Sequence, residues 1–276
     1  MRILITGSKG FVGSRLLEFF KNENIHDMLE LDNDYFADCN DWEKKLLEIL
    51  DSVEPQFVFH VGADANTLEQ RVNHMMIRNY ESTKILVNWC SENDVPFIYS
   101  SSAANYGING RTPSNLYGWS KYVAEDYVTN NKGIALRYFN VYGPGESGKG
   151  KMASFLYQSY IKNLNKEKIY LFPKRPRRDF VHIDDIVSAN KFAFTHYNSL
   201  EKTYYEVGTG TPTAFEELMD YMGFEYGYET EQYIPEGYQF YTCSNKKKWI
   251  PGWTPKFTIR DGVEHYKNYL HNMREI

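Results

Sequence analysis

Six short apolar runs, each followed by a longer stretch with helical periodicity, constrain the fold of this chain more than any other feature. The runs cover residues 2–6, 28–31, 56–61, 96–100, 133–138 and 205–207, and each is short enough to be a buried strand. Apolar side chains recur at i, i+3 and i+4 in residues 11–20, 42–50, 67–91, 117–129 and 184–197. Strands that alternate with helices predict repeated βαβ units and a parallel sheet.

The alternation loosens in two zones, one from Gly143 to residue 176 and one from Gly210 to the last residue. Between them, residues 177–194 read as a strand followed by a capped helix that returns to the main domain. We therefore expect an α/β fold, a Rossmann-type doubly wound parallel sheet with a smaller, discontinuous α/β substrate lobe. The predicted dinucleotide-binding domain is 1–142 with 177–209, and the predicted substrate lobe is 143–176 with 210–276.

Charge and cysteine usage exclude several classes of protein. The net charge of -5 and the pI near 5.9 give no basic surface for the phosphates of a nucleic acid. The three cysteines, Cys39, Cys90 and Cys243, are an odd number without metal-ligand spacing, which favours a reducing compartment, predicts no metal site and indicates the cytoplasm. No apolar run approaches the ~18 residues of a membrane span, so we expect no membrane partner.

Three glycines, Gly7, Gly10 and Gly13, form a GxxGxxG run between the first strand and the first helix. Such glycines permit a tight turn and let the backbone approach a pyrophosphate, which then lies at the helix N-terminus. A strand-to-helix turn without a ligand is the alternative. The strand before the run and the helix after it favour a dinucleotide site.

Asp32 ends the second strand about twenty residues past the glycines, where a carboxylate can bind the adenosine ribose. A strand-end turn is the alternative, because Asp and Asn also favour turns. A 2'-phosphate would favour a basic residue in the loop after Asp32, and the next ones are Lys44 and Lys45, on the following helix. The sequence therefore favours NAD as cofactor, with NADP possible.

The fourth strand runs into Ser102, and a helix then opens with the residues YGWSK at Tyr117. Tyr117 and Lys121 are four residues apart, so both project from one face of the helix. An ammonium group beside a phenol is expected to lower the phenol pKa and to make it a usable general base. Ser102 could hydrogen-bond the same substrate oxygen.

The spacing of tyrosine and lysine alone proves nothing in a chain with 23 tyrosines. The same YxxxK pattern recurs at Tyr80 with Lys84, inside a long helical pattern, and at Tyr170 with Lys174, in the irregular lobe. We assign packing roles to those two tyrosines. The serine-rich strand end fifteen residues before Tyr117 distinguishes it as the catalytic candidate.

Five segments, TGSKGFVGS, SSSAANYG, YGWSK, RYFNVYGP and RDFVHIDD, resemble the extended short-chain dehydrogenase/reductase (NAD-dependent epimerase/dehydratase) family, in that family's order. Within it, GPGESGKGKMAS, PFIYSSSAANYG and GYQFYTCSN resemble the 6-epimerases of ADP-L-glycero-D-manno-heptose. The resemblance implies an enzyme that inverts a carbinol carbon of a nucleotide-diphosphate sugar through a transient ketone and bound NAD(P). We also expect a homo-oligomer.

The resemblance also implies a role for individual residues beyond the glycine turn and Asp32. Cofactor contacts would come from Phe11, Val12, Asn33, Asp38, Cys39, Gly62, Ala63, Asn79 and Val141, together with Tyr117 and Lys121. For Cys39, a small buried residue is an equally good interpretation. For Asn79, a structural hydrogen-bonding role near the site is slightly favoured, because Asn inside a helix needs a partner.

Substrate contacts would fall to Ser102, Asn140, Lys151, Phe172, Arg178 and Tyr238. Arg178 is the natural diphosphate ligand because its guanidinium matches phosphate oxygens, although pairing with Asp179 or Asp184 is an alternative. Lys149 corresponds to a second acid/base on the far side of the sugar carbon. Its alternative is a flexible, solvated loop, since GESGKGK has that composition.

Some positions depart from the heptose epimerase pattern. Lys151 and Gln158 replace a serine and a histidine, the basic 2'-phosphate contacts are missing, and the segment between Tyr106 and Tyr117 is shortened. A UDP-sugar 4-epimerase needs only the same three catalytic residues and stays open. Ala103 and Ala104 stand where a 4,6-dehydratase would have an Asp-Glu pair, and no cysteine follows the serines, as an epimerase-reductase would require. A non-catalytic NAD-binding scaffold would be expected to lose Tyr117.

Overall fold

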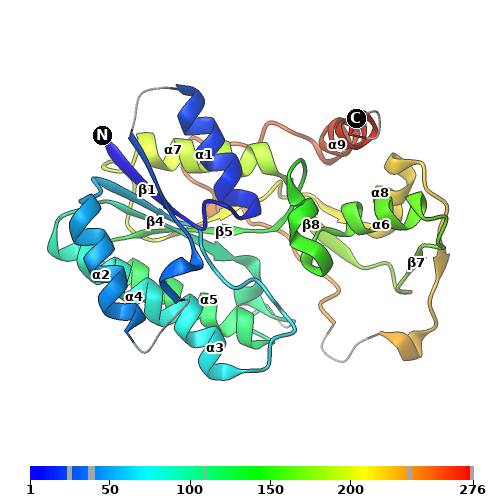
Figure 1. The fold of residues 1–276 in the computed structure, drawn as a ribbon. Helices are drawn as coiled ribbons and strands as arrows, with labels where there is room; N and C mark the ends of the chain where they lie inside the picture. The colour runs from blue at the N-terminus through cyan, green and yellow to red at the C-terminus, as the bar shows by residue number, and fades with distance from the viewer. Residues whose placement is uncertain (24–26, 37–40, 109, 235–237, 274–276) are drawn as a thin grey trace.

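A six-stranded parallel sheet forms the centre of the computed structural model, which describes residues 1–23, 27–36, 41–108, 110–234 and 238–273 (Figure 1). The strand order is β2-β1-β3-β4-β5-β9. The strands are β1 (Arg2–Thr6), β2 (Asp27–Leu31), β3 (Phe57–His60), β4 (Phe97–Ser102), β5 (Ile134–Tyr138) and β9 (Tyr204–Val207). All six predicted strands are confirmed, and so is the doubly wound α/β fold.

Helices cover both faces of this sheet. One face carries α1 (Phe11–Glu23) and α7 (Ile183–Thr195), and the other carries α2 (Trp42–Val53), α3 (Val72–Met76), α4 (Ser82–Glu92) and α5 (Leu116–Asn130). Side chains of β1 alternate between the two layers: Ile3 and Ile5 pack into the core of the first face, and Leu4 packs into the core of the second. This alternation follows from the period of two along a strand.

The helix expected over residues 67–91 begins later and is interrupted. Asp64 Oδ1 accepts the Asn66 N–H at 2.9 Å, and Asn66 Oδ1 accepts the Leu68 N–H at 3.0 Å. These local hydrogen bonds compete with helical ones, so regular helix starts only at Val72. Five residues of π-helix, η2 (Ile77–Glu81), then separate α3 from α4.

A second, three-stranded sheet of order β10-β8-β6 connects the main domain to the lobe. Its strands are β6 (Asn140–Tyr142), β8 (Arg177–His182) and β10 (Pro212–Ala214). β8 therefore does not join the main sheet, and the chain returns to the main domain through α7. Val181 of β8 packs into the main core while its neighbour Phe180 packs into the lobe core. The predicted division into residue ranges stays a prediction.

The lobe is built from short elements around a separate apolar core that includes Tyr142, Leu218 and Tyr266. Its elements are η4 (Glu146–Met152), α6 (Phe155–Leu164), β7 (Tyr170–Leu171), α8 (Phe215–Met222), β11 (Gly227–Tyr228), η5 (Glu231–Tyr233) and α9 (Ile259–Asn272). Short helices η1 (Asn33–Phe36), η3 (Ala103–Tyr106) and η6 (Lys246–Lys248) complete the assignment. Among the described residues, no helix is both long and apolar enough to cross a membrane.

Candidate active site

A cleft of about 600 Å³ runs along the carboxyl ends of the central strands. Parallel strands all end at this edge of the sheet, which is where α/β proteins of this type bind ligands. Most of the predicted cofactor and catalytic residues line this one cleft: Gly7, Gly10, Phe11, Val12, Gly13, Asp32, Asn33, Gly62, Ala63, Ser102, Tyr117, Lys121, Val141 and Lys149. The predicted substrate residue Lys151 lines it too. Asp38 and Cys39 lie outside the described residues.

The glycine turn has no room for side chains. Gly7 has a φ of +67°, and a Cβ atom there would stand 2.6 Å from the Cα atom of Gly62. A Cβ atom on Gly13 would stand 2.1 Å from the Gly7 carbonyl oxygen. The turn therefore brings backbone from β1, β3 and the first turn of α1 together, and it opens the N-terminus of α1 toward the cleft. This cradle fits the pyrophosphate of a dinucleotide.

Asp32 and a lysine that the sequence reasoning missed mark the predicted ribose end of the cleft. The Asp32 carboxylate accepts the Ser8 hydroxyl at 2.8 Å, and Lys9 Nζ lies 3.8 Å from Asp32 and 3.7 Å from Asp34. The search for a basic residue covered only the loop after Asp32, whereas Lys9 belongs to the glycine turn. Two carboxylates already compensate its charge.

The end of β4 lies beside the start of α5. This arrangement brings Ser102, Tyr117 and Lys121 together in the cleft. Ser102 is the last residue of β4, and Tyr117 follows the Asn115 cap of α5, whose Oδ1 accepts the Gly118 N–H at 2.8 Å. The Ser102 hydroxyl lies near the Tyr117 phenol and acts to lower its pKa. Lys121 is buried, and its ammonium lies 4.1 Å from the centre of the Tyr99 ring.

The pKa of Tyr117 moves in the direction opposite to the one expected from the sequence. Burial raises this pKa, the nearby Ser102 hydroxyl opposes the rise, and the Asp64 carboxylate adds a smaller increase. Burial also lowers the pKa of Lys121 to about 7, against a smaller opposing effect of Glu125. The expectation counted the charge of Lys121 and neglected the cost of burying both groups.

Lys149 faces the same cleft from η4, and its ammonium lies 4.8 Å from the centre of the Phe11 ring. Burial lowers the pKa of Lys149, and the nearby Glu146 opposes this shift. The buried Glu146 carboxylate anchors the segment by accepting the Ser154 N–H at 2.5 Å and its hydroxyl at 2.7 Å. Lys149 itself is partly buried against the cleft, but Ser147, Gly148, Gly150 and Lys151 around it are exposed, so the solvated loop stays an alternative for this segment.

Asn79 does not line the cleft. It is buried in η2, its Oδ1 accepts the Asp64 N–H at 2.7 Å, and its Nδ2 donates to the Ser120 hydroxyl at 2.9 Å. Asn79 therefore links the segment after β3 to the first turns of α5, which carry Tyr117 and Lys121. This is the structural role that the sequence favoured.

Three of the predicted substrate residues gather in the lobe, outside the cofactor cleft. The rings of Phe172 and Tyr238 meet edge to face at 4.9 Å, and the Arg178 guanidinium lies 5.2 Å from the centre of the Tyr238 ring. Arg178 is 8% exposed, and its Nη1 has no hydrogen-bond partner in the described structure. Its burial lowers its pKa, and Tyr238 opposes this shift.

The carboxylates proposed as partners of Arg178 are satisfied elsewhere. Asp179 accepts hydrogen bonds from Thr209, Gly210 and Ser244, and Asp184 pairs with Arg15 at 3.1 Å. The alternative that placed Arg178 in an ion pair with Asp179 or Asp184 is therefore wrong. Arg178 is instead a buried cation available to a ligand.

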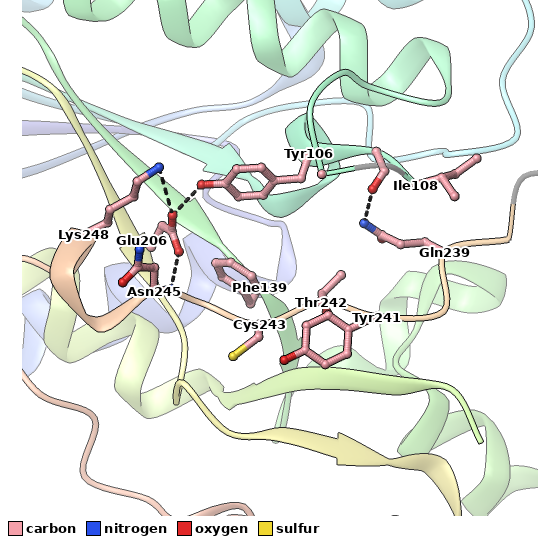
Figure 2. A pocket seen from close by; sticks show the side chains of 12 residues that line it. Tyr106, Ile108, Phe139, Glu206, Gln239, Tyr241, Thr242, Cys243, Asn245 and Lys248 are labelled. Atoms are coloured by element: carbon pink, nitrogen blue, oxygen red, sulfur yellow. Dashed lines mark hydrogen bonds and ion pairs between the residues drawn. The ribbon is translucent and has the colours of Figure 1, made fainter. Parts of the chain in front are cut away.

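Asn140, the remaining predicted substrate residue, lies exposed at the start of β6, where its Oδ1 accepts the Thr242 hydroxyl at 3.3 Å. Thr242 belongs to a second pocket of about 430 Å³, which shares Phe139 with the cofactor cleft (Figure 2). The sequence reasoning did not identify this pocket. The buried Glu206 carboxylate links two sides of this pocket, because it accepts hydrogen bonds from the Tyr106 hydroxyl and the Asn245 N–H.

A doubly wound parallel sheet with a glycine cradle, a strand-end serine and a helical Tyr-Lys pair defines a dinucleotide-binding enzyme of the short-chain dehydrogenase type. The family model described as "NAD dependent epimerase/dehydratase family" matches residues 3–208. The chain belongs to this family, and the protein is an NAD-dependent enzyme.

Comparisons with individual proteins show which members of the family this chain resembles. The chain is 33% identical to an ADP-L-glycero-D-manno-heptose-6-epimerase of Brachyspira hyodysenteriae, over 97% of each protein. It is 26% identical to the heptose-6-epimerase structure from Helicobacter pylori, with a TM-score of 0.84 over 98% of this chain and 96% of that one. A UDP-glucose 4-epimerase structure from Thermotoga maritima has the same fold, with a TM-score of 0.84 at 23% identity over 99% of this chain and all of that chain.

Proposed function

We propose that this protein inverts one carbinol carbon of an ADP-glycero-manno-heptose, as a 6-epimerase. The observation that carries the proposal is the convergence of Tyr117 and Lys149, two proton-transfer groups on different elements, on one cleft with the cofactor cradle. A second acid/base lets the oxygen of the ketone be protonated in an orientation that differs from the one in which the hydroxyl lost its proton. The 33% identity over 97% of the chain to a heptose epimerase supports the choice of sugar.

Arg178 supports a diphosphate in the substrate. A buried guanidinium with a free N–H group is stabilised by an anion that accepts its hydrogen bonds, and phosphate oxygens match its geometry. The rings of Phe172 and Tyr238 flank it and offer apolar faces for a nucleoside. We assign these three residues to the nucleotide-diphosphate part of the substrate.

The proposed chemistry starts at Tyr117. The phenolate removes the proton of the sugar hydroxyl, Ser102 donates a hydrogen bond to the same oxygen, and Lys121 helps Tyr117 to lose its own proton. NAD, which the glycine turn and Asp32 would hold, would supply the removal of a hydride from the carbon and its return to the opposite face. Lys149, on the other side of the cleft, gives a proton to the carbonyl oxygen of the ketone when that oxygen faces it.

A panel of ADP-, UDP- and GDP-sugars incubated with the NAD-bound enzyme tests the proposal, with NMR detection of inversion at each carbon. We expect inversion at carbon 6 of the ADP-heptose, and none with Tyr117→Phe. Inversion at carbon 4 of a UDP-sugar would replace this function by that of a 4-epimerase. A protein that binds no NAD and leaves every sugar unchanged would favour the scaffold alternative.

We also propose that the enzyme is a homo-oligomer of the cytoplasm. Trp119 and Tyr122 lie exposed on α5 with ring centres 5.9 Å apart, which supports a subunit contact on this helix. Cys90 and Cys243 are free thiols, which supports a reducing compartment. Light scattering of the purified protein and of a Trp119→Glu variant tests the contact, since we expect the variant to have the mass of one chain.

A further inference from the structure

A buried carboxylate that the proposed chemistry does not use lies on the helix of the catalytic tyrosine. Tyr117, Lys121 and Glu125 are spaced four residues apart on α5, so all three side chains project from one face of the helix. Glu125 is 4% exposed, and the buried Arg137 of β5 binds it through Nε at 2.7 Å and through Nη2. The pair therefore joins the helix that carries Tyr117 to the central sheet.

Two further donors connect this carboxylate to the chain on either side of Ser102. The Ser101 hydroxyl donates to Glu125 Oε2 at 2.6 Å, and the Asn105 amide donates to the same oxygen at 3.1 Å. Ser101 and Arg137 are partners in the register of β4 and β5, so their side chains lie on the same face of the sheet. We call Glu125, Arg137, Ser101 and Asn105 the Glu125 anchor, and all four are buried.

Ser102 points the other way, into the cofactor cleft, as the alternation of side chains along a strand requires. Its hydroxyl accepts the Ala104 N–H at 3.1 Å and caps η3, the short helix that contains Asn105. The anchor therefore holds the residue directly before Ser102 and the helix directly after it. A displacement of either would move the Ser102 hydroxyl, because at most two residues separate it from each contact.

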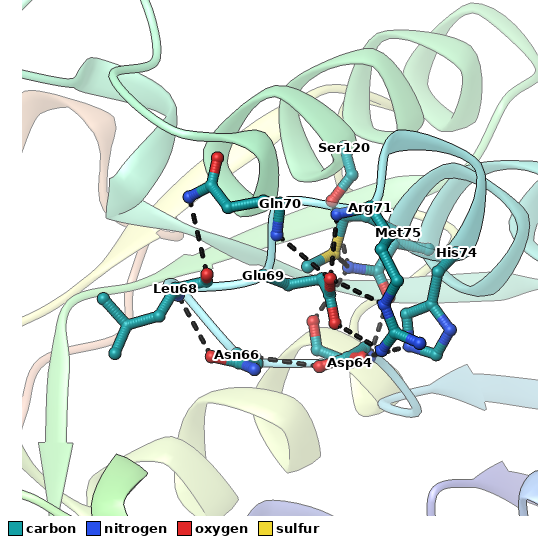
Figure 3. A network of polar contacts seen from close by, with 10 residues as sticks. Asp64, Asn66, Leu68, Glu69, Gln70, Arg71, His74, Met75 and Ser120 are labelled. Carbon is teal, nitrogen blue, oxygen red and sulfur yellow. Dashed lines mark hydrogen bonds and ion pairs between the residues drawn. The ribbon is translucent and has the colours of Figure 1, made fainter.

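The position of Tyr117 depends on a further contact. Figure 3 shows Ser120, whose hydroxyl accepts the Asn79 amide at 2.9 Å and donates to the Tyr117 carbonyl at 2.8 Å. This contact holds the first turns of α5 without the help of β4. Loss of the hydrogen bonds between Glu125 and β4 should therefore move Ser102 while Tyr117 stays in place.

We propose that the Glu125 anchor positions the catalytic Ser102, so that its hydroxyl meets the substrate oxygen from which Tyr117 removes a proton. A buried ion pair is a poor source of stability, because the cost of taking two charges out of water offsets much of their attraction. Here it gives three donors, from Ser101, Asn105 and Arg137, one acceptor atom in a fixed place. The inference rests on the proposed role of Ser102, and the anchor acts through Ser102 without touching the substrate.

The double variant Ser101→Ala/Asn105→Leu tests the anchor, because it removes both donors beside Ser102 and keeps the ion pair. Substitution of Glu125 alone would leave Arg137 buried without a partner and would strongly destabilise the fold. The assay uses the NAD-bound enzyme and a nucleotide sugar that reduces its cofactor. We expect the rate of NAD reduction to fall by about 10–10²-fold, the effect of a small misplacement, and the NAD occupancy to stay the same. An unchanged rate overturns the inference.

The same two substitutions in a Ser102→Ala background separate positioning from a general loss of structure. If the anchor acts through Ser102, they cause no further loss there, because no hydroxyl is left to misplace. A further loss of the same size overturns the inference. The matched control, Ser82→Ala, removes a buried hydroxyl that donates to the Arg78 carbonyl at 2.7 Å, and it leaves the rate unchanged.

A measurement without substrate separates this inference from the proposed function. In NAD-bound protein labelled with ¹³C at the tyrosine Cζ atoms, the Tyr117 signal is assigned by its loss in Tyr117→Phe. We expect Ser101→Ala/Asn105→Leu to move this signal in the same direction as Ser102→Ala, because both take the Ser102 hydroxyl away from the phenol. A signal at the wild-type position overturns the inference. If the signal moves but no sugar reduces the cofactor, the proposed function fails and the placement of Ser102 by the anchor stands. Thermal melting confirms that each variant is folded.

Discussion

Gly13 in the first turn of α1 packs directly on the carbonyl group of Gly7. A Cβ atom at position 13 would stand 2.1 Å from the Gly7 oxygen and 2.8 Å from its carbonyl carbon. Both contacts are with backbone, which cannot rotate away as a flexible side chain would. The contact fixes how closely α1 approaches the end of β1, and it thereby sets the position of the helix N-terminus at the cofactor cleft.

Gly13→Ala should therefore separate α1 from the glycine turn and weaken NAD binding. Overpacking of this kind costs about 1–3 kcal/mol, so the loss should be visible in urea unfolding. NAD released by heating the purified protein measures the cofactor occupancy. Gly10→Ala should cost less, because its Cβ would stand 3.1 Å from the same oxygen. Gly148→Ala is the control, since nothing lies within 4 Å of its Cβ. Equal NAD occupancy in all three variants would contradict the argument.

Lys121→Met should abolish activity and stabilise the protein near neutral pH. Burial lowers the pKa of Lys121 from 10.5 to about 7. Between these values the unfolded chain binds a proton that the folded protein does not bind, so wild-type stability rises with pH across this window. The gain from the substitution should be on the order of 2–4 kcal/mol at pH 6 and much smaller at pH 10. A pH-independent difference in the free energy of unfolding would contradict this explanation.

His60 should contribute to unfolding in acid. It lies in β3 between Thr6 and Thr83, at 2.6 and 2.8 Å, and burial lowers its pKa from 6.5 to about 3. The stability from the neutral imidazole is complete above pH 6.5 and is lost as the pH falls toward 3. In that window, wild-type stability should fall more steeply than that of His60→Gln, by about 1.4 kcal/mol per pH unit for one proton. The free energies of unfolding are measured with urea at several pH values. If those of the wild type and of His60→Gln fell in parallel between pH 6.5 and 3, His60 would be excluded as the group responsible.

Arg178→Met should weaken substrate binding and leave the chemical step intact. Because the guanidinium is buried and has an unpartnered N–H group, its proposed partner is the substrate diphosphate. Loss of a charge-assisted pair costs about 1.5–3 kcal/mol, so KM should rise by an order of magnitude or more while kcat changes little. Arg178→Lys should recover only part of the loss, because an ammonium cannot bind two phosphate oxygens in the same plane. An unchanged KM would remove Arg178 from the substrate site.

The strands of the fold were predictable because each is a short apolar run with a glycine or polar residue at its end. The position of β8 was not predictable, because the residues of a strand do not specify which neighbour it pairs with. The side chains of β8 face two different cores, with Val181 toward one and Phe180 toward the other. An apolar strand of this kind has the same sequence pattern as one in the main sheet.

The cleft residues were predictable where a motif joins neighbours in sequence, as it does for Tyr117 and Lys121. The direction of the Tyr117 pKa was predicted wrongly, because burial depends on the packing of the whole domain. The pairing of Asp64 with His74 had no signal in the sequence, because the hydrogen bonds of Asn66 delay the helix between them. Lys9 was overlooked for a related reason, since it reaches Asp32 from a turn more than twenty residues earlier.

Lys149→Met should separate the two halves of the proposed reaction. Tyr117 and Lys121 stay in place, so the substituted enzyme should still oxidise the sugar, and bound reduced cofactor should accumulate on addition of the ADP-heptose. Inversion should slow by about 10²–10⁴-fold, the usual contribution of one acid/base group. Absorbance of the reduced cofactor follows the first half, and NMR of the sugar follows the second.

The matched control is Lys162→Met on the exposed part of α6, which should leave both halves unchanged. Epimerisation by Lys149→Met at the wild-type rate would remove Lys149 from the mechanism, and the ketone would then have to turn within the pocket, with its oxygen returning to Tyr117 and its other face presented for hydride return.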